Sequence, residues 1–380
     1  MKKWYTVIVA IVLLFSIVPA VVSAKAEEDN YPSNSQLGNE VTARIATYNM
    51  HTGIGTDGNY NLDRLANTIR ESGADIIGLQ EVDVHWSSRS QFENQIEILA
   101  DTLDMDYFFA PIYNMGPPAE DEPRRQYGVA VLSKYPILHA DNHEIARLST
   151  QDSNPVPKPV PGFLETQIHV DGEELWFYVT HLDYRSDPTV RQMQVDDMLE
   201  IMSGHNNSIL VGDMNATPES PELAPLFQQF EDTWTLTNEN PGYTFPADSP
   251  DRRIDYVLTT PGMEVHSASV FPSMASDHLP VMADVTFEPG NHPLDASGLE
   301  SLVEYYVEEG EFADDDAVRS LKIHLTAVSH YEDQESAEKV VKHMEGFKRL
   351  LDHQQENESI SESAFQTLKT GAEYVIEKWE

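Results

Sequence analysis

The sequence has no cysteine among its 380 residues. Disulfide bonds and thiol chemistry are therefore excluded, and stability has to come from core packing, bound metal or surface charge. Basic residues are also scarce, with 24 Lys and Arg against 64 Asp and Glu, which gives a formal net charge of −40. A charge of this sign and size favours solubility and opposes spontaneous binding to nucleic acid or anionic lipid.

Long apolar runs are missing everywhere except at the N-terminus. There, Lys2 and Lys3 precede an apolar stretch over residues 7–22, and small residues follow. This order predicts a signal peptide that is cleaved after residue 24 or 26. A permanent membrane anchor is the alternative, but the stretch is short for a hydrocarbon core of about 30 Å and contains Pro19 near its end. We therefore expect a secreted protein without a stable membrane anchor after cleavage.

Composition divides the remaining chain into a lead-in and two domains. Residues 27–40 are polar and predict a flexible lead-in, and residues 41–288 alternate short β-rich runs with amphipathic helical runs. This alternation is typical of a layered α/β domain. A turn-rich linker follows over residues 289–296, and residues 297–380 predict a small all-α domain of three or four amphipathic helices.

Polar residues follow or interrupt the apolar strand runs at several places. These residues are Asn49, Glu81, His181, Asp213, Asn215, Asp255, Asp277 and His278. The rim of a sheet, just beyond a buried strand, is where functional sites commonly form. Taken singly, each residue has an ordinary explanation: Asn49 as a turn residue, Asp213 as part of an Asx turn, Asp255 as an ion-pair partner of an adjacent arginine. Their oxygen-rich chemistry together suits Mg²⁺ or Mn²⁺, with Ca²⁺ as a third candidate, better than zinc.

The order of these segments resembles that of the endonuclease/exonuclease/phosphatase superfamily. The segments that carry the resemblance are Thr47–His51, Leu79–Asp83, Thr180–Leu182, Gly212–Asn215, Arg253–Tyr256 and Ser276–His278. The resemblance spans residues 41–288 and implies a four-layer α/β/β/α sandwich of two packed mixed β-sheets. It further implies a divalent-metal-dependent hydrolase that cleaves phosphoester bonds by attack of activated water.

The resemblance also implies roles for individual residues. Glu81 would bind the metal with Asn49 and Asp277 nearby, Asp213 would orient the attacking water, and Asn215 would hold the phosphate or a second metal. His278, paired with Asp255, would be the general base or would stabilise the transition state. His181 would donate a hydrogen bond to the phosphate or act as a second acid or base. His51 and Tyr127 are expected to line the cleft. Where many relatives have asparagine after the central glycine, this chain has Val129, which leaves one phosphate contact in doubt.

The C-terminal segment resembles a second known unit. Its apolar pattern, from Leu302 through Leu321 and Phe347 to Ala364, is similar to the FIMAH-type helical module found at the C-termini of exported enzymes of Gram-positive bacteria. Helical core spacing explains these residues fully, so the pattern leaves the role of the module open. Attachment or spacing at the cell surface of such a bacterium is our hypothesis for it.

Three substrate classes compete. A small or lipid-derived phosphoester conflicts with nothing in the sequence, and we favour a phosphodiesterase or phosphatase of this type. A nuclease needs a cationic track along the phosphates, and the few arginines here have acidic neighbours, so nucleic acid is a less favoured substrate. A sphingomyelinase needs apolar loops to enter lipid, whereas the candidate loop over 111–123 is Pro-rich and acidic. The non-enzymatic alternative is a surface-binding protein with a degenerate fold, but no expected catalytic residue is missing.

Overall fold

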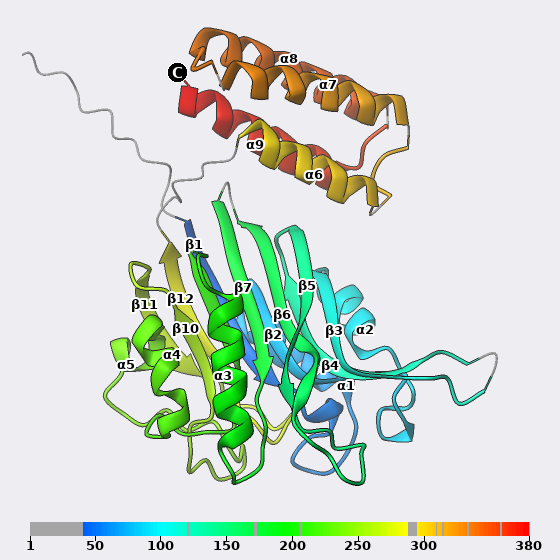
Figure 1. Ribbon diagram of the computed structural model, residues 1–380. Coiled ribbons are helices and arrows are strands. Elements are labelled where there is room, and N and C mark those ends of the chain that lie inside the picture. Colours follow the sequence, from blue (N-terminus) through cyan, green and yellow to red (C-terminus); the bar gives the residue numbers. More distant parts are fainter. Residues whose placement is uncertain are drawn as a thin grey trace, which may run out of the picture. The chain divides into compact units, whose positions relative to one another are not determined.

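The computed structural model describes residues 41–119, 122–170, 173–205, 207–287, 295–308, 310–313, 315–332, 334–357 and 359–379. The expected signal peptide over 1–26, the lead-in over 27–40 and most of the linker over 289–296 lie outside the described residues. The described chain forms an α/β domain and, after it in sequence, a set of four helices (Figure 1).

The described part of the α/β domain contains two β-sheets of six strands each. The strands are β1 (Val41–Asn49), β2 (Ile76–Val84), β3 (Asp106–Met115), β4 (Arg125–Ser133), β5 (Ile137–Arg147), β6 (Lys158–Val170), β7 (Glu173–His181), β8 (Ser208–Asp213), β9 (Glu231–Asp232), β10 (Asp255–Thr259), β11 (Glu264–Val270) and β12 (Val281–Phe287). The first sheet has the order β11-β12-β1-β2-β4-β3, and the second has the order β5-β6-β7-β8-β10-β9.

Each sheet is mixed because it contains one parallel pair. β1 pairs with β2 in parallel, and β7 pairs with β8 in parallel, while the other pairs are antiparallel. A parallel pair needs a crossover connection, and the helices α1 (Leu62–Ser72) and α3 (Thr189–Ile201) provide the two crossovers. The expected two mixed sheets are thus confirmed.

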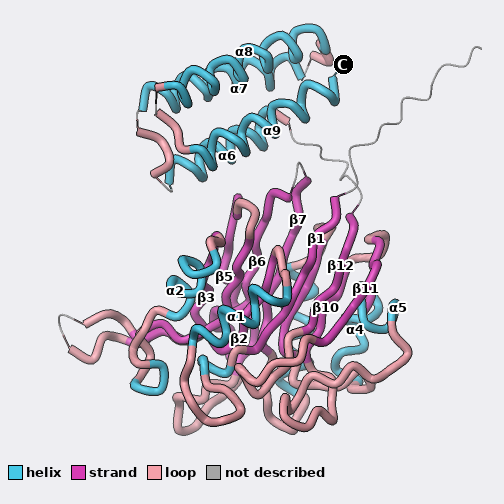
Figure 2. The backbone as a smooth tube through the Cα atoms, turned by 180° about the vertical axis from the view of Figure 1, so that it is seen from behind, coloured by secondary structure: helices cyan, strands magenta, loops and turns pink. Residues whose placement is uncertain are grey.

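Four layers result from alternating burial along the strands. Ile45 of β1 faces the core between the sheets with Val179 and Val211, whereas Tyr48 of β1 faces α1 and α2 (Gln95–Leu103). Helices α3 and α4 (Ala224–Gln229) cover the outer face of the second sheet through a separate apolar cluster. The short helix α5 (Thr233–Thr237) precedes β10. The helices lie outside the strands, and loops gather at one end of the strands (Figure 2).

The C-terminal helices form their own apolar core. They are α6 (Ala296–Glu308), α7 (Asp315–Glu332), α8 (Ala337–Glu356) and α9 (Glu362–Trp379). Side chains such as Leu302, Leu325, Phe347 and Leu368 are fully buried among them. The prediction of three or four helices is confirmed with four in the described part. No described helix combines the length and apolar character that a membrane crossing requires.

Candidate active site

Three neighbouring strands of the second sheet place their polar end residues in one row. His181 ends β7, Asp213 ends β8, and Asp255 begins β10. The strand register pairs His181 with Asp213 and Asp213 with Asp255. Because β10 is antiparallel to β8, its first residue lies at the same edge as the last residues of β7 and β8. Residues that are 32 and 42 positions from Asp213 in sequence thus become its lateral neighbours.

Asn49 connects the two sheets at this edge. It ends β1 of the first sheet and is 1% exposed. Its Nδ2 donates to Asp213 Oδ2 at 3.0 Å and to Glu81 Oε1 at 3.4 Å, so one amide touches a carboxylate of each sheet. Its Oδ1 accepts from the backbone N–H of His51 at 3.1 Å. Asn49 therefore fixes the separation of the two carboxylates.

Glu81 stands at an irregularity of β2. The register of β2 against β4 shifts between Leu79 and Val82, and Glu81 has a φ of 61°. A left-handed conformation is unfavourable for a glutamate and is typically retained at functional positions. The irregularity turns Glu81 toward the cavity, which it lines, while its neighbours Gln80 and Val82 are fully buried.

His278 and Asp255 form a buried imidazole–carboxylate pair. His278 Nδ1 lies 3.0 Å from Asp255 Oδ2, and Thr244 Oγ1 donates to the same Oδ2 at 2.6 Å. Burial works against the charged imidazole, but the carboxylates of Asp255 and Asp213 outweigh it and raise the pKa of His278 to about 10. These carboxylates therefore favour the charged form of His278, while burial raises the pKa of Asp255 above its usual value. The Phe245 ring, 4.7 Å from that of His278, limits the ring's freedom.

Asp213 lies between two imidazoles. Its Oδ2 is 3.5 Å from His181 Nε2 and 3.7 Å from His278 Nε2. Its Oδ1 accepts from the backbone N–H of Asn215 at 2.9 Å, and Asn215 Nδ2 donates to the carbonyl of Leu182 at 3.0 Å. Asp213 is thus held from both sides and points one oxygen toward both histidines.

Asp277 and His51 occupy the rim. Asp277 lines the cavity, and its Oδ1 lies 3.5 Å from His51 Nδ1. His51 Nδ1 is also 3.0 Å from the carbonyl of Ile54, so this nitrogen carries the hydrogen and donates it. His51 itself is absent from the cavity lining. It contacts the site through Asp277.

The cavity has a volume of ≈ 460 Å³, and most of the expected residues line it. The lining includes Glu81, Tyr127, His181, Asp213, Asn215, Asp277 and His278. Asn49 and Asp255 lie behind this lining, bonded to Asp213 and His278 respectively. The structure thus brings the residues expected from the sequence together, while their chemical roles remain predictions. Val129 is fully buried in the core between the sheets, so it makes no phosphate contact.

One wall of the cavity is aromatic, and the sequence predicts only one of its residues, Tyr127. Trp86, Tyr113 and Tyr127 have ring centroids 5.9–6.1 Å apart. The Arg89 guanidinium lies 5.6 Å from the Tyr127 ring and pairs with Asp83 at 2.7 Å. Burial and the nearby Glu81 carboxylate raise the pKa of Tyr127 well above its usual value, so its hydroxyl stays protonated. The wall offers flat apolar surface with a cation at its edge.

Arg147 is a second cation of the cavity and is not among the residues predicted from the sequence. It ends β5 and lines the cavity, and its guanidinium donates to the carbonyls of His181 and Gly162 at 3.0 and 2.7 Å. Burial lowers its pKa to about 10, still far above neutral. Arg147 directly follows the buried residues Ile145 and Ala146. This is the same strand-end signal that identifies Asp213, so the sequence contains the information needed to predict Arg147.

Comparison with protein-family models decides the family. The model of the endonuclease/exonuclease/phosphatase family matches residues 46–278, more than half of the chain. The chain belongs to this family. Members of the family are phosphoester hydrolases that typically use divalent metals. The model of the FIMAH domain matches residues 296–377, which confirms the resemblance of the helical segment.

The chain is also similar to individual proteins. The chain is 26% identical over 265 residues to the uncharacterized protein YbhP of Escherichia coli K12, covering 64% of this chain and 95% of YbhP. A family member from Beutenbergia cavernae has a crystal structure that aligns with a TM-score of 0.54 at 23% identity, over 65% of this chain and 72% of that one. A family member from Bacteroides vulgatus aligns with a TM-score of 0.51 at 21% identity, over 66% and 100%. At these identities the two structures show the fold alone.

Proposed function

We propose that the protein is a metal-dependent hydrolase of small phosphoesters, and that water attacks the phosphorus atom in the cavity beside Asp213. The observation that carries this proposal is the position of Asp213. One of its oxygens meets Asn49 and lies within 4 Å of two imidazoles, in a cavity that Glu81 and Asp277 also line. This arrangement supplies a proton acceptor, two proton donors and separate oxygen ligands around one space.

The residues present fit a hard divalent cation. Glu81 and Asp277 line the cavity, and within the described chain neither pairs with a lysine or arginine. Glu81 lies 3.4 Å from the amide of Asn49, and both carboxylates offer oxygen donors, which Mg²⁺ and Mn²⁺ prefer. We therefore assign metal binding to Glu81 and Asp277, with Asn49 adjacent. A bound ion would supply positive charge that stabilises the negative charge developing on the phosphoryl group.

The chain's own residues supply proton transfer and orientation. Asp213 accepts a hydrogen bond from the attacking water, because its Oδ2 faces the cavity and Asn49 holds it in place. The imidazolium of His278, kept charged by Asp255, donates from Nε2 to a phosphate oxygen as charge accumulates there. His181 and Asn215 are placed on the same lining to contact the remaining oxygens or the leaving group.

Cavity size and wall chemistry support a small organic phosphoester. A space of ≈ 460 Å³ suits a molecule of metabolite size. The rings of Trp86, Tyr113 and Tyr127 can stack on a flat or apolar leaving group, while Arg147 attracts the phosphate. We infer that the substrate carries such a group next to its phosphate.

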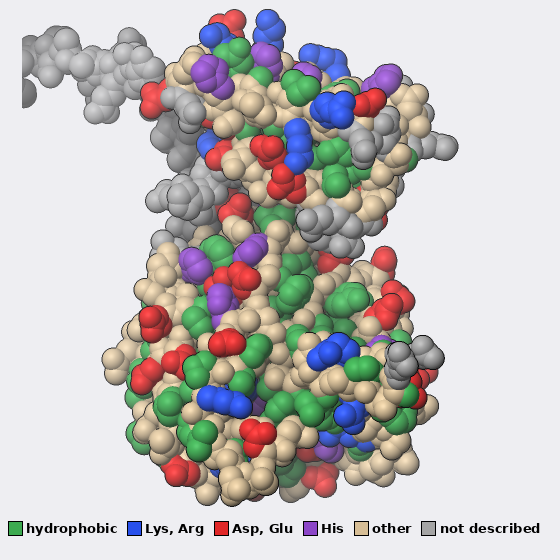
Figure 3. Space-filling model, turned by 45° about the vertical axis from the view of Figure 1, so that its right-hand side comes forward, with side chains coloured by type: hydrophobic (Ala, Val, Ile, Leu, Met, Phe, Trp, Pro, Cys, Tyr) green, Lys and Arg blue, Asp and Glu red, His purple; other side chains and the backbone are tan. Residues whose placement is uncertain are grey.

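A nuclease is the second candidate, because the aromatic wall could also stack a base. Two observations weigh against it. On the face seen in Figure 3, basic side chains are scattered among acidic ones and form no continuous band across the described surface of the α/β domain. Arg89 and Arg185, which line the cavity, pair with Asp83 and Asp183. The formal net charge of −40 adds to this repulsion of a polyanion.

The test compares the wild-type chain with Glu81→Gln and His278→Gln on bis(p-nitrophenyl) phosphate in Mg²⁺ or Mn²⁺, before and after EDTA. We expect EDTA to abolish turnover and each substitution to lower kcat at least about 100-fold. His266→Gln, on the distant strand β11, is the matched control and keeps wild-type turnover. Full activity of Glu81→Gln, or activity that survives EDTA, would refute the proposal.

The substrate class requires a separate assay. The wild-type chain is offered DNA, RNA, sphingomyelin, inositol phosphates and nitrophenyl esters at equal phosphate concentration. Highest kcat/KM on a small ester supports the proposal, and highest kcat/KM on DNA or RNA would establish the nuclease instead. Binding of these compounds without turnover of any of them would favour the non-catalytic alternative.

We also propose that the protein is secreted and that its helical domain attaches it to the cell surface. The support for secretion is the pattern of residues 1–26, and the support for attachment is only the resemblance to the FIMAH-type module. N-terminal sequencing of the exported protein is expected to begin at residue 25 or 27. An intact N-terminus in the cell fraction would contradict cleavage.

A further inference from the structure

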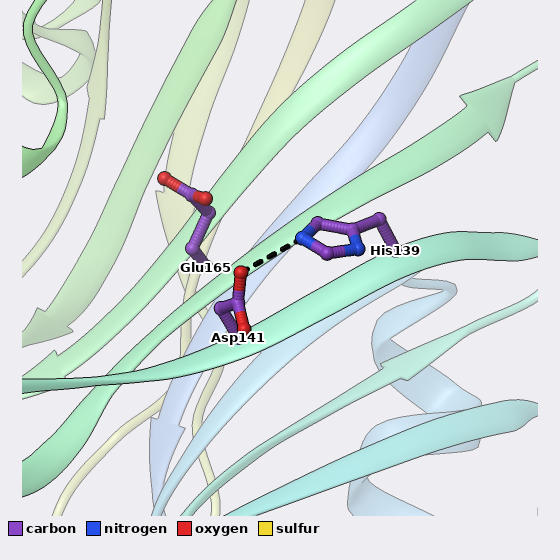
Figure 4. A group of neighbouring side chains, drawn as sticks. All are labelled: His139, Asp141 and Glu165. Carbon is purple, nitrogen blue, oxygen red and sulfur yellow. Dashed lines mark hydrogen bonds and ion pairs between the residues drawn. The ribbon is translucent and has the colours of Figure 1, made fainter.

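A second group of metal-ligand side chains lies on β5 and β6, apart from the active site. Residues 139–143 of β5 read His-Ala-Asp-Asn-His, so every second side chain can ligate a metal. Alternating strand residues point to the same face, and Asp141 is in register with Glu165 of β6. Figure 4 shows His139, Asp141 and Glu165 projecting from two adjacent strands. None of the three lines the active-site cavity.

The ligand atoms of the three residues are close together. His139 Nε2 lies 2.8 Å from Asp141 Oδ2, and the three residues each place one ligand atom within 4.8 Å of the other two. Ligands bound to one zinc ion at about 2.0–2.1 Å are roughly 3.3 Å apart. His139 and Asp141 are exposed, so small side-chain rotations close the remaining gap.

Glu165 is the unusual member, because it is a carboxylate that is only 6% exposed. Within the described chain it pairs with no lysine or arginine. Its two oxygens instead face His143 Nε2 at 3.3 Å and His205 Nδ1 at 3.6 Å. His143 Nε2 is itself buried and has no hydrogen-bond partner in the described structure. A buried carboxylate is costly unless a positive charge compensates it, and a cation held with His139 and Asp141 would provide that charge.

Other side chains hold the buried side of this group rigid. Tyr178 Oη lies 2.5 Å from His205 Nδ1, and the His205 ring stacks on Trp176 with 3.8 Å between centroids. Support of this kind behind a ligating carboxylate is characteristic of metal sites. The exposed side carries the two movable ligands, so an ion could enter from solvent.

We propose that His139, Asp141 and Glu165 bind a divalent transition-metal ion, with Zn²⁺ as the best-fitting candidate. One imidazole and two carboxylates balance the charge of the ion, and the imidazole favours Zn²⁺ over Mg²⁺ or Ca²⁺. His143 stands beside Glu165, with Nε2 3.3 Å from Oε1. Since the three ligands lie outside the active-site cavity, the site acts on the stability of the second sheet rather than on turnover.

The experiment isolates this site from the active site. The full chain carrying Glu81→Ala and Asp277→Ala is titrated with Zn²⁺ by calorimetry in excess Mg²⁺, and with Co²⁺ by visible absorption. We expect one Zn²⁺ per chain and a Co²⁺ d–d band. Adding His139→Ala to this background is expected to weaken Zn²⁺ binding about 100-fold and to remove the band.

The matched control is His266→Ala in the same background. His266 is also a partly exposed strand histidine with acidic residues near it, Glu264 at 3.6 Å and Asp284, but both of these carboxylates are partly or fully exposed, unlike Glu165. It is expected to bind Zn²⁺ as its parent does. Equal binding by the His139→Ala and His266→Ala chains, or no Zn²⁺ bound by the parent, would overturn the proposal. Because His139→Ala in an otherwise wild-type chain should keep its phosphoesterase activity, failure here is distinguishable from failure of the proposed function.

Discussion

Asp213, which ends β8, depends on residues from three other strands for its position. Asn49 of β1, His181 of β7 and Asp255 of β10, acting through His278, all contact it or its partners. Its exposed fraction is 1%, so its charge is stabilised by these neighbours rather than by water. Substitutions among them should therefore change the chemical step more than substrate binding.

Asp255→Asn tests this dependence. The amide keeps the shape of the side chain and can still bond Thr244, but it cannot hold His278 as an imidazolium. We expect kcat to fall about 100-fold or more with little change in KM, as occurs when a carboxylate that orients a catalytic histidine becomes an amide. Steady-state kinetics on a nitrophenyl phosphodiester measures this. Asp232→Asn is the control, since Asp232 is another buried carboxylate but pairs with Arg253 outside the cavity lining. An equal loss in both variants would indicate destabilisation instead.

The sequence predicted the polar members of the site better than its wall. Asn49, Asp213 and His181 stand where an apolar run stops, and this pattern can be recognised without any knowledge of the fold. Tyr113 and Trp86 carry no such signal, because aromatic residues in strands and turns are ordinary core candidates. They meet only because β2 and β3 both pair with β4 in the folded sheet. The sequence alone does not reveal this strand pairing.

At the level of elements, the strand and helix runs were predictable where periodicity was strong. The run over 62–71 became α1, the run over 189–202 became α3, and the run over 208–211 became β8. The irregularity of β2 at Glu81 was not predictable, because a bulge depends on the partner strand and leaves the hydrophobic pattern unchanged. It is nevertheless what aims Glu81 at the cavity.

Close packing of β3 against β4 predicts that Gly128→Ala is destabilising. A Cβ at residue 128 would lie 2.1 Å from the carbonyl oxygen of Ala110 and 2.8 Å from Pro111 Cα, so the backbone itself must move. We expect a loss of about 1–3 kcal/mol in the free energy of unfolding, measured by urea denaturation. Gly116→Ala is the control, because open space surrounds residue 116. Equal stability of the two variants would contradict the packing.

His169 of β6 predicts that acid destabilises the second sheet. Burial lowers its pKa from 6.5 to about 4. As the pH falls below 6.5, the unfolded chain binds a proton at His169 and the folded chain does not. The neutral imidazole therefore contributes fully to the free energy of unfolding above pH 6.5, and this contribution is lost as the pH falls to about 4. The difference between the two pKa values corresponds to about 3 kcal/mol in the free energy of unfolding. His169→Gln should flatten the pH dependence of unfolding in this window relative to wild type, whereas His266→Gln should not. Parallel curves for all three chains would refute the assignment.

On the scale of the whole molecule, the buried core of the helical domain is supplied by its own residues. Its buried members lie between Ala296 and Ile376, and the three apolar clusters of the α/β domain lie between Val41 and Val285. Composition and the loss of strand signals after residue 288 predicted two domains, and this division stays a prediction. These features could not predict the substrate, because the cavity that selects it is built by side chains from distant parts of the chain.

Separate cores predict that each domain folds alone. A chain that ends at residue 294 should keep kcat within about twofold of the full-length value, since none of the residues described after 294 lines the cavity. The fragment 295–380 should be helical by far-ultraviolet circular dichroism and unfold cooperatively. A tenfold loss of kcat in the shortened chain, or an unstructured fragment, would show that the domains need each other.

The pairing of β1 with β12 has a consequence for how this chain is assembled. Val41 is in register with Phe287, so the first and last strands of the α/β domain are neighbours in the middle of the first sheet. During synthesis β1 therefore cannot pair with its antiparallel partner β12 until almost the whole domain has been made. The same pairing places the first and last residues of the α/β domain next to each other. Segments can therefore be joined at both ends of the domain without interrupting its fold.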